Sequence, residues 1–364
     1  MPVWLYHTWL ERLGQLHTGE RITVLRNFAW LLVGLYASGS VHLSKVADEL
    51  PSSAKLPSVT RRLTRLLANP AVRVRTWYEP LARRLLAEQG KSTGEIRLIV
   101  DGSKIGFHHQ LLIVSLAFRR RALPIAWTWI PHERGHSSVS AQVALMAYVH
   151  KLLPQDVPVL LVGDTEFGHV PLLRQLEIWG WHYVLRQKSD YLVQLPQRPA
   201  PLPFGFFARQ AGQSEWLGKG WLTNQHRFPV HLLVHWQMGE KQPWLLATNL
   251  PDKRRALAAY RRRMWVEEMF GDFKKHGFDL EATHLCHFSR LSRLTLAVAL
   301  LYVWLIHVGA TTIKQGLRHC VDRHDRRDLS LFRIGRSYIK RCLKSDSPPP
   351  NAFLPLSQWK LSGG

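Results

Sequence analysis

The order of apolar segments between residues 95 and 186 constrains the fold most strongly. Short runs rich in branched and aromatic residues, bounded by Gly, Pro or Asp, predict strands, and longer runs with a three- and four-residue apolar period predict helices. The predicted strands are 96–100, 111–118, 123–130, 157–162 and 182–185, and the predicted helices are 141–153 and 170–180. Three strands, a helix, a strand, a helix and a strand predict a mixed sheet with helices packed on it.

This order is that of an RNase H-like core. We therefore predict an α/β fold with an RNase H-like catalytic core, a β-rich insertion before the last catalytic helix, and helical N-terminal and C-terminal regions. The predicted divisions are a helical DNA-binding domain (1–92), the first part of the core (93–186), the insertion (187–250), the second part of the core (251–312) and a basic C-terminal region (313–364).

The flanking regions differ in texture from the core. Residues 1–92 show helical spacing and no alternating run, whereas a Pro-rich stretch after Gln187 leads into alternating runs at 215–223, 228–236 and 244–248. Four tryptophans in these runs need a packing surface, so we predict a folded β insertion rather than a linker. After Pro251 the chain is predicted to be helical through Lys275, and residues beyond 345 are predicted to be irregular.

The charge balance indicates the partner. Lys and Arg total 49 against 26 Asp and Glu, giving a formal net charge of +23. An excess of this size is most often matched by a polyanion, and because the basic residues are spread along the whole chain, nucleic acid is favoured over an anionic membrane surface. A merely basic protein, such as a ribosomal one, is the alternative.

Two helices in the N-terminal region resemble a helix-turn-helix arrangement. The segments HLSKVADEL and SVTRRLTRLL are separated by PSSAKLP, and the second carries Arg61, Arg62 and Arg65. We predict that these arginines contact DNA. A small helical bundle with one basic helix would show the same pattern.

Two aspartates stand at matching places in the predicted core. Asp101 follows the first strand and Asp164 follows the fourth. If these strands are parallel neighbours, both carboxylates emerge at the same edge of the sheet, where open α/β sheets bind ligands. Phosphodiester chemistry with two metal ions requires carboxylates that converge in this way.

A stripe of charged residues follows the insertion, in AAYRRRMWVEEMFGDFKKHGF. Tyr260, Arg263, Glu267 and Lys274 lie at offsets of 0, 3, 7 and 14, within roughly 60° of one helix face. Glu268 would point about 80° away from Tyr260 and Asp272 about 120° away. The stripe thus combines one carboxylate with two cations and a phenol, although a solvated charged face is equally compatible with the spacing.

At this point the chain resembles a known family. The Y-x2-R-x3-E-x6-K spacing is similar to the signature of the cut-and-paste insertion-sequence DDE transposases of the group numbered four. VDGS around Asp101, VGDTEFG around Asp164 and the β insertion before Glu267 extend the resemblance over roughly residues 95–285.

The resemblance implies the chemistry of each matching residue. Asp101, Asp164 and Glu267 would bind two Mg²⁺ ions, with Mn²⁺ as a possible substitute. Tyr260, Arg263 and Lys274 would hold phosphates near the cleaved end. A further match, Trp244 in WLLATNLP, would stack on a base flipped out of the duplex, as hairpin formation would require; a core tryptophan is its alternative. The implied partners are double-stranded DNA, both element-end inverted repeats and target, and a second copy of the chain in a synaptic dimer.

Three other patterns point elsewhere. The residues 132–136 spell H-E-x-x-H, but Pro131 and Gly135 argue against the helix that a zinc protease needs. Cys286 lies between His284 and His287, a metal pair without further ligands. The apolar stretch 294–310 is short for a membrane span and contains a histidine, so a buried core helix is favoured.

The prediction is therefore a DNA transposase that cuts element ends and joins them to target DNA. Three cysteines form no disulfide framework and no signal peptide is recognisable, so we expect a cytoplasmic, nucleoid-associated protein of a bacterium or archaeon. The alternatives are a non-catalytic DNA-binding relative or repressor, and an RNase H-like nuclease without strand transfer.

Overall fold

The computed structural model describes residues 3–106, 109–131, 136–223, 227–325 and 327–345. It forms two compact units, residues 93–268 on the one hand and residues 1–92 together with 269–364 on the other. The H-E-x-x-H pattern and the predicted irregular tail fall largely outside the described residues. Each unit is described by itself.

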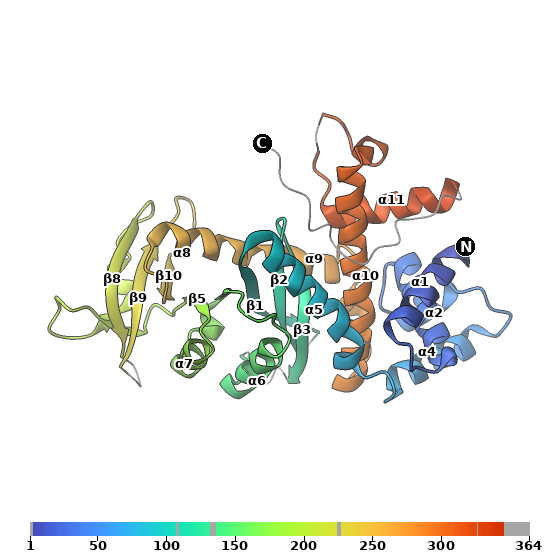
Figure 1. The fold of residues 1–364 in the computed structure, drawn as a ribbon, viewed down its shortest axis with the longest axis horizontal. Coiled ribbons are helices and arrows are strands. Elements are labelled where there is room, and N and C mark those ends of the chain that lie inside the picture. The colour runs from blue at the N-terminus through green and yellow to red at the C-terminus, as the bar shows by residue number, and fades with distance from the viewer. Residues whose placement is uncertain (1–2, 107–108, 132–135, 224–226, 326, 346–364) are drawn as a thin grey trace. The chain divides into compact units, whose positions relative to one another are not determined.

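A mixed sheet runs through the unit 93–268 (Figure 1). Its strands are β1 (Ile96–Ile105), β2 (His109–Phe118), β3 (Arg121–Pro131), β4 (Val159–Gly163), β5 (His182–Arg186), β6 (Leu192–Gln194), β7 (Leu202–Pro203), β8 (Ser214–Leu222), β9 (Phe228–His235) and β10 (Trp244–Thr248). The strand order is β3-β2-β1-β4-β5-β10-β9-β8-β6-β7. The chain is thus mixed α/β with a large sheet and many helices.

The pairing of β1 explains where the two aspartates lie. As predicted, β1 and β4 are parallel neighbours, and their last paired residues are Val100 and Gly163. Asp101 and Asp164 therefore follow at the same edge of this parallel pair. The prediction that the strand ends at Val100 was wrong, because β2 continues to pair with β1 as far as Ile105.

The insertion continues the core sheet. Strand β10 pairs with β5 on one side and with β9 on the other, so β8, β9 and β10 belong to the same sheet as the two aspartates. The helices α6 (Val139–His150) and α7 (Val170–Ile178) lie on one side of this sheet, and α8 (Lys253–Tyr260) lies on the other (Figure 1).

The segment after the insertion is not the single helix that was predicted. α8 is followed by a 3-10 turn, η3 (Arg261–Met264), and then by α9 (Trp265–Phe273). A 3-10 turn has 3.0 residues per turn instead of 3.6, so it rotates the residues that follow it relative to an ideal α-helix. The angles calculated for Tyr260, Arg263, Glu267 and Lys274 on one ideal helix therefore do not apply, and the side-chain distances in the structure show which of these residues lie together.

The second unit is helical. Its main helices are α1 (Val3–Leu16), α2 (Ile22–Ser38), α3 (Leu43–Asp48), α4 (Leu56–Ala68), α5 (Val74–Thr93), α10 (Phe288–Lys314) and α11 (Leu331–Ser345). Four short 3-10 turns complete the two units: η1 (Thr165–Phe167), η2 (Phe204–Phe207), η4 (Leu280–Ala282) and η5 (Leu317–Cys320). Among the described residues α10 alone is long and apolar enough to cross a membrane, and 94% of its apolar stretch is buried inside the protein.

Candidate active site

Asp101 is a buried carboxylate on a central strand. It is 6% exposed, and its Oδ1 accepts a hydrogen bond from the backbone N–H of Gly102 at 2.8 Å. Burial raises the pKa of Asp101 to about 7, although Arg263 opposes the shift. The charge of Glu267, and more weakly that of Asp164, adds to the increase in this pKa. A cation close to this carboxylate stabilises its charged form and so lowers its pKa.

Asp164 lies directly after β4. Its Oδ1 accepts a hydrogen bond from the N–H of Thr165 at 2.8 Å, which fixes the carboxylate as the N-cap of η1. The Nη1 of Arg186, at the end of β5, lies 3.8 Å from the same oxygen. The second oxygen, Oδ2, therefore remains available to the centre of the site.

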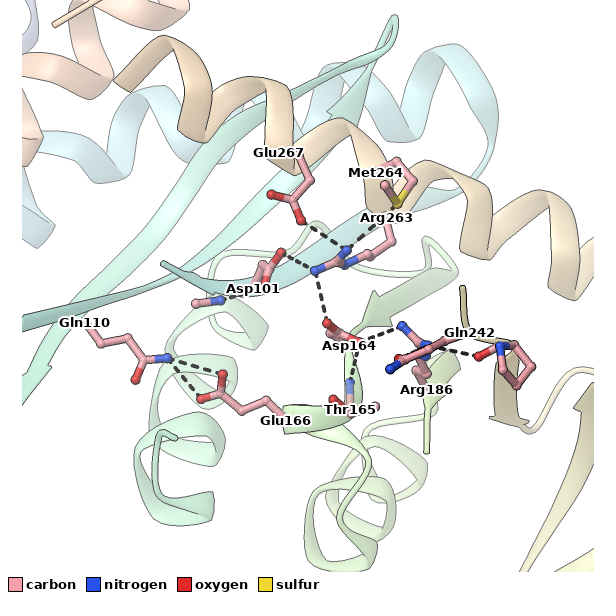
Figure 2. A network of polar contacts seen from close by, with 12 residues as sticks. Asp101, Gln110, Asp164, Thr165, Glu166, Arg186, Gln242, Arg263, Met264 and Glu267 are labelled. Atoms are coloured by element: carbon pink, nitrogen blue, oxygen red, sulfur yellow. Dashed lines mark hydrogen bonds and ion pairs between the residues drawn. The ribbon is translucent and has the colours of Figure 1, made fainter. Parts of the chain in front are cut away.

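Arg263 occupies that centre (Figure 2). Its Nη2 lies 3.0 Å from Oδ2 of Asp101 and 3.2 Å from Oδ2 of Asp164, and its Nη1 lies 3.1 Å from Oε1 of Glu267. Burial favours a lower pKa for Arg263, but the surrounding carboxylates raise it above its ordinary value. The structure therefore brings Asp101, Asp164, Arg263 and Glu267 together around one guanidinium.

Glu267 and its neighbour Glu268 have separate partners. Glu267 joins the cluster through Arg263, one helical turn before it. Oε2 of Glu268 instead pairs with Nη1 of Arg121, at 2.6 Å. The geometry thus separates the two adjacent glutamates, and only Glu267 faces the aspartates.

Tyr260 and Trp244 form an aromatic pair next to the cluster. Their ring centroids are 5.0 Å apart at an interplanar angle of 68°. Tyr260 is 2% exposed, and burial raises its pKa above the ordinary range of a tyrosine. Trp244 is half-buried and also contacts His235, with a centroid distance of 5.2 Å. Tyr260 thus packs against Trp244, and a phosphate contact by its hydroxyl stays a prediction.

The other predicted DNA-contacting residues lie in the helical unit. Lys274 follows α9, and its Nζ lies 3.1 Å from Oε1 of Glu281. Arg61, Arg62 and Arg65 lie on α4 and line a cleft of about 1250 Å³ that Arg21 also borders. A DNA contact by these residues stays a prediction.

Glu166, two residues after Asp164, was not predicted as a site residue. Its carboxylate accepts hydrogen bonds from Nε2 of Gln110 at 3.2 Å and from both the N–H, at 2.6 Å, and the hydroxyl of Ser137. A Cβ at position 102 would come within 3.2 Å of Oε2 of Glu166, so glycine after Asp101 leaves room for this network. These hydrogen bonds connect η1 to β2 and to the residues just before α6. The sequence feature that could have identified Glu166 as a site residue is its position in VGDTEFG, two residues after Asp164.

The donor set of the cluster fits a divalent cation. Two aspartates and a glutamate offer only hard carboxylate oxygens, which Mg²⁺ prefers, and the cluster already surrounds a positive charge. With Arg263 between the carboxylates, no group of three His, Cys, Asp or Glu among the described residues is close enough to hold a metal ion. Cys286 and its neighbouring histidines also form no group of three potential metal ligands among the described residues.

The comparison with protein families decides the identity of the core. The sequence model of the family described as "Transposase DDE domain" matches residues 93–304, more than half of the 364 residues. The chain belongs to the transposase DDE domain family. Membership of this family implies a transposase or nuclease activity that acts in DNA transposition. DDE transposases generally use divalent metal ions.

Two further comparisons accompany this one. A solved cryo-EM structure of a piggyBac transposase synaptic complex with hairpin DNA is similar to the chain at 11% sequence identity and a TM-score of 0.40, covering 99% of this chain and 84% of that chain. No curated protein matches the chain.

Proposed function

We propose that this DDE transposase cuts the ends of an insertion sequence and joins the resulting 3′-OH ends to target DNA, as in the insertion-sequence transposases of the group numbered four, whose signature is Y-x2-R-x3-E-x6-K. The observation that carries the proposal is the convergence of Asp101, Asp164 and Glu267 on one cation within a transposase DDE domain. In this proposal the sheet from β1 to β5 is an RNase H-like catalytic core.

Asp101, Asp164 and Glu267 would hold the metal ions. Two Mg²⁺ ions, or Mn²⁺ in their place, would activate the attacking oxygen and neutralise charge on the leaving oxygen when bound. Because the guanidinium of Arg263 lies between the carboxylates, it must withdraw before they can close on a metal. Once withdrawn, its planar donors suit a phosphate, which is the role proposed for it.

The remaining predicted residues would act on DNA around the cut. Trp244, half-buried and packed against Tyr260, would receive a base displaced by the tight bend of a hairpin. Lys274 and the α4 arginines would hold phosphates of the inverted repeat. We further propose a homodimer bound to paired element ends, acting in the cytoplasm of a bacterium or archaeon on nucleoid DNA.

The test is metal-dependent cleavage of DNA carrying the inverted repeats that flank the gene. Asp101→Asn, Asp164→Asn and Glu267→Gln should each reduce cleavage below detection while end binding persists, because each removes a carboxylate from the cluster. Denaturing gels would separate hairpin from open ends.

Glu268→Gln is the matched control, because it makes the same chemical change one residue away at a side chain that pairs with Arg121. It should cleave at close to the wild-type rate. Normal cleavage by Glu267→Gln would disprove the assignment of the third carboxylate, and end binding without cleavage by the unaltered protein would favour a non-catalytic binder.

A further inference from the structure

The outer strands of the sheet carry aromatic and basic side chains on one face. Residues paired across antiparallel strands point to the same side of a sheet. The register pairs Trp221 with Pro229, Lys219 with His231, Trp216 with Leu233, and Ser214 with His235. We name the five aromatic and basic residues on this side, Trp216, Lys219, Trp221, His231 and His235, the aromatic face.

Apart from Leu233, which is 0% exposed, this side of the outer strands is not part of the buried core. The alternate residues of β9, Val230, Leu232 and Val234, are at most 5% exposed, so the opposite face of these strands packs into the core. On the aromatic face Lys219 is exposed, and the two tryptophans and two histidines are only half-buried. Large aromatic rings that remain partly exposed in this way are available to a partner.

The aromatic face contains one stacked pair of rings and one tryptophan with an arginine over its ring. Trp216 and His231 stack with centroids 5.3 Å apart at 23°, and Cζ of Arg227 lies 4.3 Å from the ring centroid of Trp221. Burial and the nearby Lys219 lower the pKa of His231, which favours the neutral form of its ring. Flat rings alternate with positive charges along the strand pair.

The aromatic face and the candidate active site lie on the same side of the sheet, with two leucines that are 0% exposed, Leu246 and Leu233, between them. A single row of cross-strand partners runs from Arg186 on β5 through Leu246 and Leu233 to Trp216 on β8. Arg186 at one end of the row lies 3.8 Å from Asp164. In the adjacent row His235 contacts Trp244, the residue proposed to receive a displaced base.

We propose that the aromatic face binds unpaired nucleotides of the DNA strand that leaves the active site past Trp244. Bases stack on aromatic side chains irrespective of sequence, while lysine and arginine pair with the phosphates. A sheet that displays aromatic rings is an established surface for single strands. This proposal rests on the proposed function for its ligand, because cutting an element end is what supplies the unpaired strand.

The experiment measures binding without cleavage. Fluorescence anisotropy with the full-length protein in Ca²⁺ would compare three probes: a blunt duplex of the element end, the same duplex with a single-stranded extension, and the single strand alone. The double variant Trp216→Ala/Trp221→Ala should bind the extended duplex and the single strand more weakly by on the order of 30-fold or more, with blunt-duplex binding unchanged. The variant Trp216→Phe/Trp221→Phe, which keeps aromatic rings, should bind like the wild type.

Trp179→Ala is the matched control. Trp179 is also half-buried and also stacks on a histidine, His150, at 5.0 Å and 14°, but it lies at the end of α7 and not on the aromatic face. Its loss should leave all three probes unaffected. Lys219→Ala should weaken binding of the extended duplex and reduce its salt dependence.

Several outcomes would overturn the proposal. They are unchanged binding of the extended duplex by the double alanine variant, an equal loss on all three probes, or an equal loss in Trp179→Ala. If the wild type cuts element ends but one of these three contradicting results is obtained, the proposal about the aromatic face fails while the proposed function stands. If the wild type binds the probes as expected but never cuts, the proposed function fails instead.

Discussion

At the scale of single residues, Arg263 determines the electrostatics of the site. Two unit charges about 4 Å apart interact by about 4 kcal/mol at an effective dielectric constant of 20, so three converging carboxylates repel one another strongly. The Arg263 side chain is 13% exposed and touches all three. A planar group with five N–H donors is suited to serve several carboxylates at once.

Proton and metal compete for Asp101. Because its pKa is raised to about 7, Asp101 holds a proton over much of the range below pH 7 in the metal-free protein, and metal binding must release it. We expect the affinity for Mn²⁺ to fall by up to about tenfold for each pH unit below 7 and to level off above it. Isothermal titration between pH 5.5 and 8.5 would measure both affinity and proton release.

Asp101→Asn provides the control for this titration, since it should bind Mn²⁺ more weakly and lose most of the pH dependence near 7. An affinity of the wild type that does not change between pH 6 and 8 would contradict the raised pKa of Asp101.

At the scale of elements, the contact between α10 and α11 depends on two glycines. A Cβ at Gly309 on α10 would meet the carbonyl oxygen of Leu331, and a Cβ at Gly335 on α11 would meet that of Leu305. In both cases the obstacle is backbone, which cannot rotate away as a side chain can. The two helices therefore cross at a distance that only glycine allows.

Gly335→Ala should lower the free energy of unfolding by about 1–3 kcal/mol, because the added methyl group overpacks this crossing. Urea denaturation followed by circular dichroism would measure it.

Gly14→Ala makes the same change inside α1, where a Cβ meets nothing within 4 Å. This control should stabilise the protein by about 0.5–1 kcal/mol, since alanine favours a helix over glycine. Equal effects of the two substitutions would argue against the close crossing.

At the scale of the whole molecule, a net charge of +23 makes salt-dependent attraction to DNA the expected long-range interaction. The cleft beside α4 concentrates part of that charge, because Arg61, Arg62 and Arg65 line it together with Arg21. None of these three arginines is needed to fill the core, since their side chains extend from the exposed side of α4.

The triple variant Arg61→Ala/Arg62→Ala/Arg65→Ala should weaken DNA binding. The slope of log affinity against log salt should become shallower by roughly 0.9 for each phosphate that these arginines neutralise in the wild type, up to about 3 in total. Binding assays between 50 and 300 mM salt would give the slope.

Arg75→Ala/Arg83→Ala/Arg84→Ala removes the same charge from exposed positions of α5 that do not line the cleft. A slope reduced equally by both triple variants would mean that total charge matters and the cleft does not.

The sequence by itself determined the order of strands and helices in the core, because apolar periodicity reports burial locally. It also placed Asp101 and Asp164 directly after two buried strands, whereas the parallel pairing that brings them to one edge of the sheet was a condition of that prediction which the structure met. The spacing of Tyr260, Arg263 and Glu267 identified the third carboxylate as a candidate, even though a 3-10 turn interrupts the helix that carries them.

Only the tertiary structure decided the contacts between segments distant in sequence. It placed Arg263 between the carboxylates instead of toward open surface, joined β10 to β5, and enclosed Glu166 in a network with Gln110. The physical reason is that side-chain partners and strand pairing depend on packing across the sheet, where residues more than fifty positions apart compete for the same neighbour. Local spacing shows which residues can share a face, but the charge balance at the centre of the site depends on which side chains the fold brings into contact.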